Sequence, residues 1–385
     1  MNLYDYCKWR GDLSFKKDPF NEVDNMCFAE ITYIKMKEFF EDRKSMTIRE
    51  LSDAFFEKHS VEEIQADKTF FRMSPILLRE MAKTERFASV VIHNYVSLLH
   101  EKTSEQFAAV TYDLSDGTSV IAFRGTDDTL VGWKEDMMLS YGDIASQYDA
   151  VDYLKNNFSL FKKYHIIGHS KGGYLALYAS VHADKNVKNR IIDIYSDDGP
   201  GLRPGTYSKQ DFDSIKDRYK LLVPENDGVG VIYEMAEHKK IVKVTAKNIL
   251  AAHSVLTWNI EGTHVVECDD YRYESNLIRK VLDEFIHETT RQQRYIFVEE
   301  LFNSLEEADL HNLSDFYNGG NAVIYNTLKK LSRMDDESKE VASKMMKTIA
   351  SNIGSDVMDS VSKKSQKVKD DLGSSIRKRV PNKKG

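Results

Sequence analysis

The sequence predicts an α/β fold built on a mostly parallel central sheet, and two patterns carry this prediction. Between residues 87 and 290, short runs rich in valine, isoleucine and aromatic residues alternate with helical patterns. Strands that alternate with helices form a mostly parallel sheet, whose ligands bind beyond the carboxyl ends of the strands. Residues 164–175 add a buried strand, a glycine-rich turn and a helix in direct succession.

The individual elements follow from apolar periodicity and turn residues. The expected strands are residues 88–98, 107–112, 118–123, 164–167, 190–195, 219–223, 241–245 and 265–268. The expected helices are residues 31–40, 131–139, 147–157, 174–180, 210–216 and 276–288. Residues 115–117 read as a hairpin turn between two of the strands.

Three parts are expected along the 385 residues. Residues 1–86 read as helices packed on the core, with capping boxes beginning at Thr47 and Ser60. Residues 87–290 form the α/β core, and residues 291–385 form a helical extension whose basic end is partly disordered.

The cysteines are few and widely spaced in the sequence. Cys7, Cys27 and Cys268 have no metal-ligand spacing and no pattern of a disulfide framework. We therefore expect no metal, no cofactor and a reducing, cytoplasmic compartment. The first residues contain no apolar signal segment, and no run of 18 apolar residues exists to span a membrane. We also expect no nucleic-acid partner.

The charge is distributed unevenly along the chain. Residues 361–385 carry nine lysines and arginines against two aspartates, whereas the whole chain has a net charge of −7. Residues 338–380 combine an apolar stripe with lysine-rich faces, so this region either contacts an anionic membrane surface peripherally or packs on its own body or on a second copy.

The turn at Ser170 has the form of a nucleophile elbow. Residues 168–172 read Gly-His-Ser-Lys-Gly and lie between the expected strand and the expected helix. Such a turn presents the serine hydroxyl at a helix N-terminus, and its glycines let the strand and the helix approach closely. In this context Ser170 is predicted to be a catalytic nucleophile, as found in the α/β-hydrolase fold.

An elbow serine needs an acid and a base, which follow it in the order acid then histidine in this fold. Asp227 lies just past the strand at residues 219–223 and is the predicted acid. Asp197 and Asp198 end the preceding strand and are the alternative.

The predicted base is His253, because the short connection after the strand at residues 241–245 lets it reach back over the sheet edge. The alternative is His264, although it opens the next strand at the wrong end. Three further histidines fit less well, because one precedes a strand and two lie in helical patterns: His238, His287 and His311.

The predicted oxyanion hole consists of the backbone N–H groups of Thr126 and Lys171. A tetrahedral intermediate needs one donor from the residue after the nucleophile and one from an earlier strand-to-helix loop. The side chain of Lys171 has two readings: it either meets an anionic group of the substrate or extends into solvent.

Several segments together resemble the class 3 lipases, which have the fungal triacylglycerol lipase fold, and more closely a related bacterial family of uncharacterised α/β-hydrolases. These segments are residues 9–25, 123–126 (FRGT), 132–136 (GWKED), 168–173 (GHSKGG), 226–229 (NDGV) and 253–258 (HSVLTW). The resemblance spans about residues 1 to 290.

The resemblance implies a catalytic triad of Ser170, Asp227 and His253 and an oxyanion hole at Thr126 and Lys171. The lipases usually have leucine where Lys171 stands, and their active-site lid has no clear counterpart in this sequence.

The predicted function is a serine hydrolase that cleaves a carboxylic ester or thioester, with an acyl ester or lipid as substrate and an acyl-enzyme on Ser170. A peptidase on the same fold is the alternative chemistry. A non-enzymatic scaffold, whose basic C-terminal region binds a membrane or a protein partner, is the alternative from another class.

Overall fold

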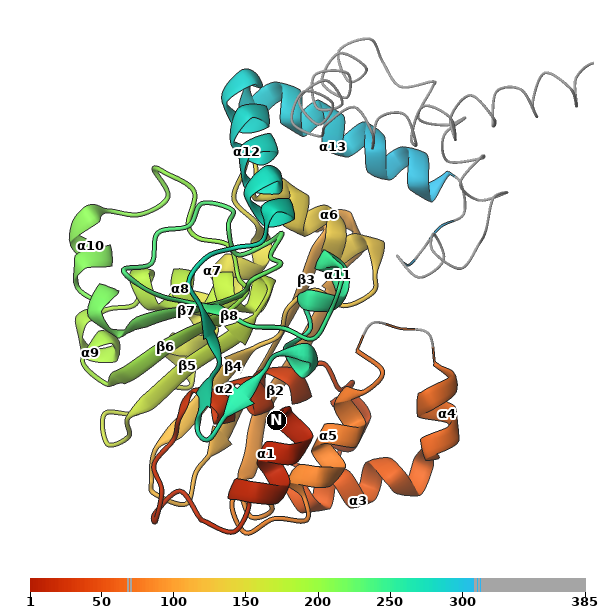
Figure 1. The fold of residues 1–385 in the computed structure, drawn as a ribbon, viewed down its shortest axis with the longest axis vertical. Coiled ribbons are helices and arrows are strands. Elements are labelled where there is room, and N and C mark those ends of the chain that lie inside the picture. Colours follow the sequence, from red (N-terminus) through yellow and green to blue (C-terminus); the bar gives the residue numbers. More distant parts are fainter. Residues whose placement is uncertain (68, 70, 308–309, 311, 313–385) are drawn as a thin grey trace, which may run out of the picture.

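The computed structural model describes residues 1–67, 69, 71–307, 310 and 312. Its centre is a nine-stranded sheet in the order β1-β2-β3-β4-β5-β6-β7-β8-β11 (Figure 1). Strands β4 to β8 pair in parallel, and antiparallel pairs continue the sheet on both sides. The predicted α/β-hydrolase fold is thereby confirmed.

The strands of this sheet are β1 (Ser45–Thr47), β2 (Val91–His100), β3 (Glu105–Asp113), β4 (Ser119–Phe123), β5 (Tyr164–His169), β6 (Ile191–Asp197), β7 (Tyr219–Pro224), β8 (His238–Val242) and β11 (Glu267–Cys268). A separate two-stranded ribbon consists of β9 (Ile260–Glu261) and β10 (His264–Val265).

The helices are α1 (Leu3–Arg10), α2 (Glu22–Ile31), α3 (Ile48–Lys58), α4 (Val61–Ala66), α5 (Ser74–Met81), α6 (Leu130–Met138), α7 (Ala145–Asn156), α8 (Lys171–His182), α9 (Lys185–Lys188), α10 (Lys209–Asp213), α11 (Ile249–Ala252), α12 (Tyr273–Glu288) and α13 (Arg291–Glu306). Short 3₁₀ turns are η1 (Lys37–Phe39), η2 (Glu101–Thr103), η3 (Lys216–Arg218) and η4 (Val255–Thr257).

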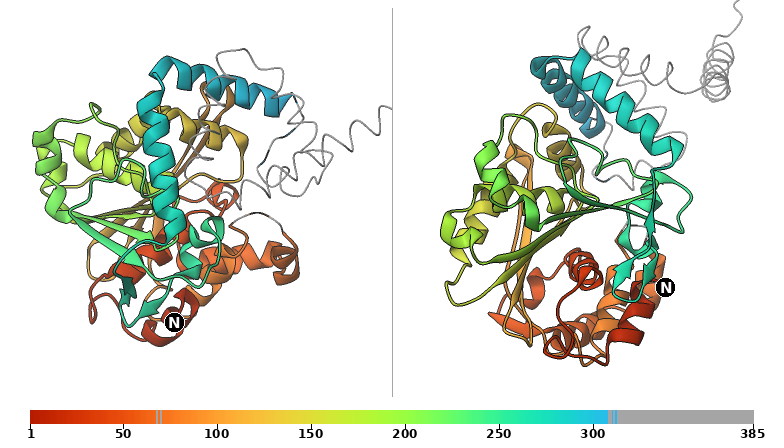
Figure 2. Two further views of the ribbon diagram at one scale, coloured as in Figure 1. Left: turned by 45° about the horizontal axis from the view of Figure 1, so that its top comes forward. Right: turned by 60° about the vertical axis from the view of Figure 1, so that its left-hand side comes forward.

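Strand β5 is buried throughout because helices cover both of its faces. Successive side chains of a strand point to opposite faces, so Ile166 joins the core with Leu175 of α8. Its neighbour Ile167 joins the second core with Phe28 of α2. The two further views show the N-terminal helices on one face and α7 and α8 on the other (Figure 2).

Helix α2 is an integral part of this core, since all ten of its residues are buried. The prediction of a helix over residues 31–40 is wrong, because α2 ends at Ile31. The hydroxyl of Thr32 donates to the carbonyl of Ala29 at 2.6 Å, and such local side-chain bonds compete with helix continuation. The segment that follows carries Tyr33 toward the end of β5.

The capping boxes predicted at Thr47 and Ser60 are both present and begin α3 and α4. The strand predicted over residues 241–245 begins and ends earlier, at His238–Val242, because its pairing with β7 sets the register. The strand predicted at residues 265–268 is divided between β10 and β11, which belong to different sheets.

Helices α12 and α13 lie at the opposite end of the molecule from α1, α3 and α5 (Figure 1). Phe297, Val298 and Phe302 of α13 pack against Leu130 of α6 and form a third, smaller core. Two predicted features, the amphipathic region at residues 338–380 and the basic end at residues 361–385, lie outside the described residues. Within the described part of the chain, no helix is both long enough and apolar enough to cross a membrane.

Candidate active site

The turn at Ser170 has the geometry of a nucleophile elbow. Strand β5 ends at His169, α8 begins at Lys171, and Ser170 between them has φ 59° and ψ −130°. A positive φ is costly for a residue other than glycine, and such backbone strain clusters at functional positions. The backbone N–H of Ser170 donates to the carbonyl of Asp197 at 2.8 Å, which ties the turn to β6.

The glycines of the elbow are required by close packing. A Cβ on Gly168 would lie 2.2 Å from the backbone of Gly172, and a Cβ on Gly172 would lie 2.1 Å from the carbonyl oxygen of Phe123. Strand β5, helix α8 and the end of β4 therefore approach one another more closely than any larger residue allows.

The loop after β4 brings Thr126 beside the elbow. A Cβ on Gly125 would lie 2.5 Å from the carbonyl oxygen of His169 and 3.1 Å from Cβ of Ser170. The hydroxyl of Thr126 donates to Oδ1 of Asp136 on α6 at 2.7 Å and so fixes this loop. Lys171 is the first residue of α8, where backbone N–H groups have no partner within the helix.

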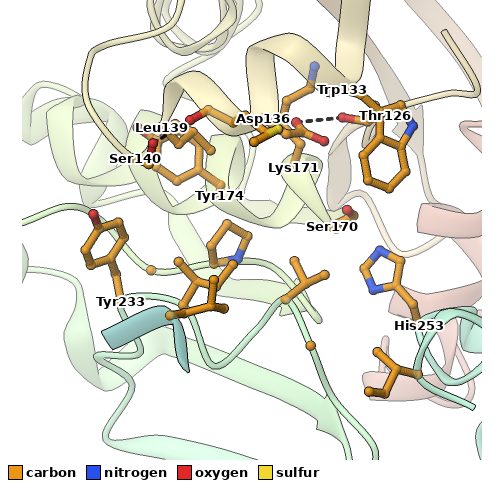
Figure 3. A pocket seen from close by; sticks show the side chains of 18 of the residues that line it. Thr126, Trp133, Asp136, Leu139, Ser140, Ser170, Lys171, Tyr174, Tyr233 and His253 are labelled. Carbon is orange, nitrogen blue, oxygen red and sulfur yellow. Dashed lines mark hydrogen bonds between the residues drawn. The ribbon is translucent and has the colours of Figure 1, made fainter. Parts of the chain in front are cut away.

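His253 follows α11 and lies at the same end of a pocket as Ser170 (Figure 3). Its Nδ1 is 2.6 Å from Oδ2 of Asp198, the residue that follows β6. With its proton on Nδ1, the imidazole has a free lone pair on Nε2, which can act as a base. Asp198 has φ 51°, a left-handed conformation that aspartate tolerates better than most residues.

The prediction that Asp227 contacts His253 is therefore wrong, and the alternative Asp198 makes that contact. Asp227 lies behind Asp198, where its Oδ1 accepts from the backbone N–H groups of Val229 at 2.7 Å and Gly230 at 3.0 Å. Strands β6 and β7 end at the same edge of the sheet. Both acids also follow Ser170 and precede His253 in the sequence, so either one satisfies the expected chain order.

The other candidate histidines lie away from the elbow. His264 is exposed in β10 and has its Nδ1 3.3 Å from Oε1 of Glu22. His238 begins β8 and His287 lies in α12, and both are exposed. His311 lies outside the described residues.

His169, which the sequence did not single out, holds the backbone of His253, and Tyr33 in turn holds His169. Nε2 of His169 donates to the carbonyl oxygen of His253 at 2.7 Å, and Nδ1 of His169 is 2.7 Å from the hydroxyl of Tyr33. Because the carbonyl accepts, Nδ1 of His169 has no proton and Tyr33 donates to it. The position of His169 next to the elbow serine was the available signal, whereas Tyr33 had none.

The ammonium group of Lys171 is buried inside the protein, so the interpretation that it extends into solvent is wrong. It is buried 2.6 Å from Oε2 of Glu135 and 2.9 Å from the carbonyl oxygen of Gln106. Glu135 is fully buried in α6, so the ion pair joins the elbow to α6 and β3.

The pocket beside Ser170 has a volume of about 460 Å³. Its polar end contains Ser170, His253, Thr126 and Asp136, whereas Ser140, Tyr174 and Tyr233 lie toward the opposite side of the pocket (Figure 3). Most of the remaining wall is apolar and comes from α6, α11, α12, α13 and the loop after β7: Trp133, Met137, Val229, Ile232, Ile249, Leu250, Leu282, Phe285, Ile286 and Phe297.

Burial controls the protonation of the site. It lowers the pKa of His253 to about 4, so the imidazole is neutral at pH 7 and free to accept a proton. It raises the pKa of Asp198 and of Asp136 to about 6 in each case. A neutral imidazole beside an ionised carboxylate is the arrangement that general-base catalysis requires.

No group of three or more histidine, cysteine, aspartate or glutamate side chains is placed to hold a metal ion within the described residues. Cys7, Cys27 and Cys268 are free thiols, the first two of them buried.

Comparison with known proteins assigns the chain to a protein family. No curated protein matches the sequence. Among solved structures, the crystal structure of M37 lipase is similar with a TM-score of 0.34 and 16% identity, over 55% of this chain and 69% of that chain. The model of the Mbeg1-like family matches residues 81–303. This match covers more than half of the sequence, and the chain therefore belongs to the lipase-like Mbeg1-like family.

Proposed function

We propose that the protein is a serine hydrolase that cleaves a carboxylic ester or thioester through an acyl-enzyme on Ser170. The observation that carries the proposal is the contact of 2.6 Å between His253 and Asp198 at the pocket end where the elbow presents Ser170. A nucleophile, a base and an orienting carboxylate in this order form a triad that is recognised by its geometry.

In the first half of the reaction, Oγ of Ser170 bonds to the carbonyl carbon while Nε2 of His253 takes the hydroxyl proton. The oxyanion that forms accepts hydrogen bonds from the backbone N–H groups of Thr126 and Lys171. The C–O or C–S bond to the leaving group then breaks, and His253 gives its proton to the alcohol or thiol. Asp198 stabilises the imidazolium formed between these two transfers.

In the second half, water replaces the leaving group. His253 takes one proton from the water as its oxygen bonds to the acyl carbon. Collapse of the second tetrahedral intermediate breaks the bond to Oγ of Ser170, which recovers its proton from His253. The carboxylic acid leaves and the enzyme returns to its starting state.

A fluorophosphonate probe tests the proposal, because such probes react covalently with an activated serine. We expect the wild-type protein to be labelled and Ser170→Ala to show no labelling. Ser180→Ala is a matched control, since Ser180 is buried in the same helix but donates to the carbonyl of Ala176 and does not line the pocket. An unlabelled wild-type protein, or labelling that persists in Ser170→Ala, would contradict the proposal.

The apolar pocket wall predicts a preference for longer acyl chains. Each methylene group buried in the pocket contributes about 0.8 kcal/mol, which corresponds to about a fourfold increase in kcat/KM. We therefore expect kcat/KM for p-nitrophenyl esters to rise steadily from acetate to octanoate. The measurement is a chain-length series at one pH.

A charge in the wall should remove this dependence. Leu282→Asp on α12 is expected to lower kcat/KM for octanoate and to change the value for acetate little, because it alters the wall and not the polar end. Phe161→Asp is the control, since Phe161 is 97% exposed and outside the pocket. Equal kcat/KM for acetate and octanoate in the wild type would exclude the pocket as the acyl-binding site.

A further inference from the structure

Two neighbouring buried carboxyl groups, those of Asp198 and Asp227, lie on the side of His253 that carries Nδ1. Asp198 follows β6 and Asp227 follows β7, two neighbouring parallel strands whose carboxyl ends lie side by side. Both side chains are fully buried. The backbone N–H of Gly230 donates to Oδ1 of Asp198 at 2.9 Å and to Oδ1 of Asp227 at 3.0 Å, so the two groups share one donor.

The hydrogen bonds of the four carboxyl oxygens show which group needs a proton. Asp198 is satisfied at Oδ2 by Nδ1 of His253 and at Oδ1 by Gly230. Asp227 is satisfied at Oδ1 by Val229 and Gly230. Its Oδ2 is buried, and within the described part of the chain no donor reaches it. A buried carboxylate oxygen without a donor keeps the full cost of its lost hydration, whereas a protonated one becomes a donor itself.

The charges around the two groups favour one shared proton. Burial raises the pKa of Asp198 to about 6 and that of Asp227 well above its ordinary value, and the carboxyl of Asp198 raises the pKa of Asp227 further. Two carboxylates in contact in a buried site do not both ionise readily. The buried Asp197 adds like charge beside Asp198, Asp136 and His169 face His253, and Tyr271 lies near Asp227.

We propose that Asp198 and Asp227 act as a pair that shares one proton, carried on Oδ2 of Asp227 and donated to the carboxylate of Asp198. Asp227 is then a positioning residue, which holds Asp198 while Asp198 holds His253. This inference rests on the proposed function of the site. In the reaction it leaves a single negative charge beside the imidazolium, so the cluster of His253, Asp198 and Asp227 is electrically neutral when His253 is protonated.

Three substitutions separate the roles of the two acids. Asp227→Asn keeps the acceptor for Val229 and Gly230 and replaces the O–H donor with an N–H donor. We therefore expect kcat to fall by about tenfold at most. Asp227→Ala removes the donor, so we expect it to lower kcat more than Asp227→Asn does. Asp198→Asn replaces the carboxylate that holds the Nδ1 proton of His253 with a neutral amide, whose N–H₂ group favours the wrong tautomer, and this costs on the order of 10⁴-fold in a comparable triad. Asparagine also tolerates the left-handed backbone at position 198.

A loss of kcat that is large in Asp227→Asn and small in Asp198→Asn would overturn the proposal, because Asp227 would then be the ionised group. An equal and large loss in both asparagine variants would overturn it too, since the pair would then require two carboxyl groups. Circular dichroism and thermal melting of each variant separate a loss of catalysis from a loss of folding.

A second measurement does not depend on turnover. In the Ser170→Ala background, the Nδ1 proton of His253 should give a strongly downfield ¹H NMR signal, which Asp227→Asn retains and Asp198→Asn shifts upfield. Loss of this signal in Asp227→Asn would contradict the shared proton. A wild-type protein without esterase turnover would refute the proposed function, and the NMR signal would still decide the pairing of the two acids.

Discussion

Replacing His253 with alanine is expected to lower kcat for a preferred ester on the order of 10⁴-fold or more, and Ser170→Ala should have a similar effect. Without the imidazole no group accepts the proton of Ser170, and without the hydroxyl no acyl-enzyme forms. Because the two residues act in one proton transfer, the double variant should lose little beyond either single variant. Steady-state turnover of the same ester by the three variants measures this.

The control for this experiment is His264→Ala, because His264 is exposed and its ring contacts Glu22 rather than the pocket. It should retain wild-type turnover within about twofold, as expected of a surface substitution. Wild-type turnover in His253→Ala would exclude His253 as the base. Losses that simply multiply in the double variant would show that Ser170 and His253 do not act together.

The position of Ser170 could be predicted because the signal is local. The strand, the two glycines and the helical pattern lie within residues 164–182, and the close approach that requires Gly168, to the backbone of Gly172, lies inside that segment. The same reason explains the success at Thr47 and Ser60, where each capping box is formed by residues three positions apart.

The orienting acid could not be chosen from the sequence, because the relevant contact is between strands. Asp198 and Asp227 both follow Ser170 and both lie just past the end of a parallel strand. The left-handed conformation at Asp198 turns this carboxylate toward His253, and a backbone angle of this kind leaves no mark in the apolar pattern. Rules of chain order therefore reduced the choice to two adjacent sites without deciding between them.

The environment of Lys171 was missed for a related reason. A lysine in a glycine-rich turn is usually exposed, and its partners Glu135 and Gln106 lie 36 and 65 residues away. Nothing in the spacing of these residues indicates that α6 and β3 meet at the elbow.

The ion pair of Lys171 and Glu135 leads to the largest expected effect on stability. Lys171→Met should destabilise the protein by about 3–5 kcal/mol, because it leaves the carboxylate of Glu135 buried and unpaired. Glu135 also accepts from the backbone N–H groups of Gln106 at 3.1 Å and Ser146 at 3.2 Å, so it cannot turn away to solvent. Urea denaturation followed by fluorescence and by circular dichroism measures the change.

The double variant Lys171→Met with Glu135→Gln tests the cause. A neutral amide at position 135 keeps one acceptor for the backbone N–H groups and removes the unpaired charge, so the double variant should be more stable than Lys171→Met alone. The control is Lys17→Met, whose ion pair with Glu85 has both side chains more than half exposed and should contribute about 0–1 kcal/mol. A single variant as stable as the wild type, or a double variant no more stable than the single, would contradict the buried pair. Since the backbone N–H of residue 171 is unchanged in every variant, the folded fraction should keep most of its esterase activity.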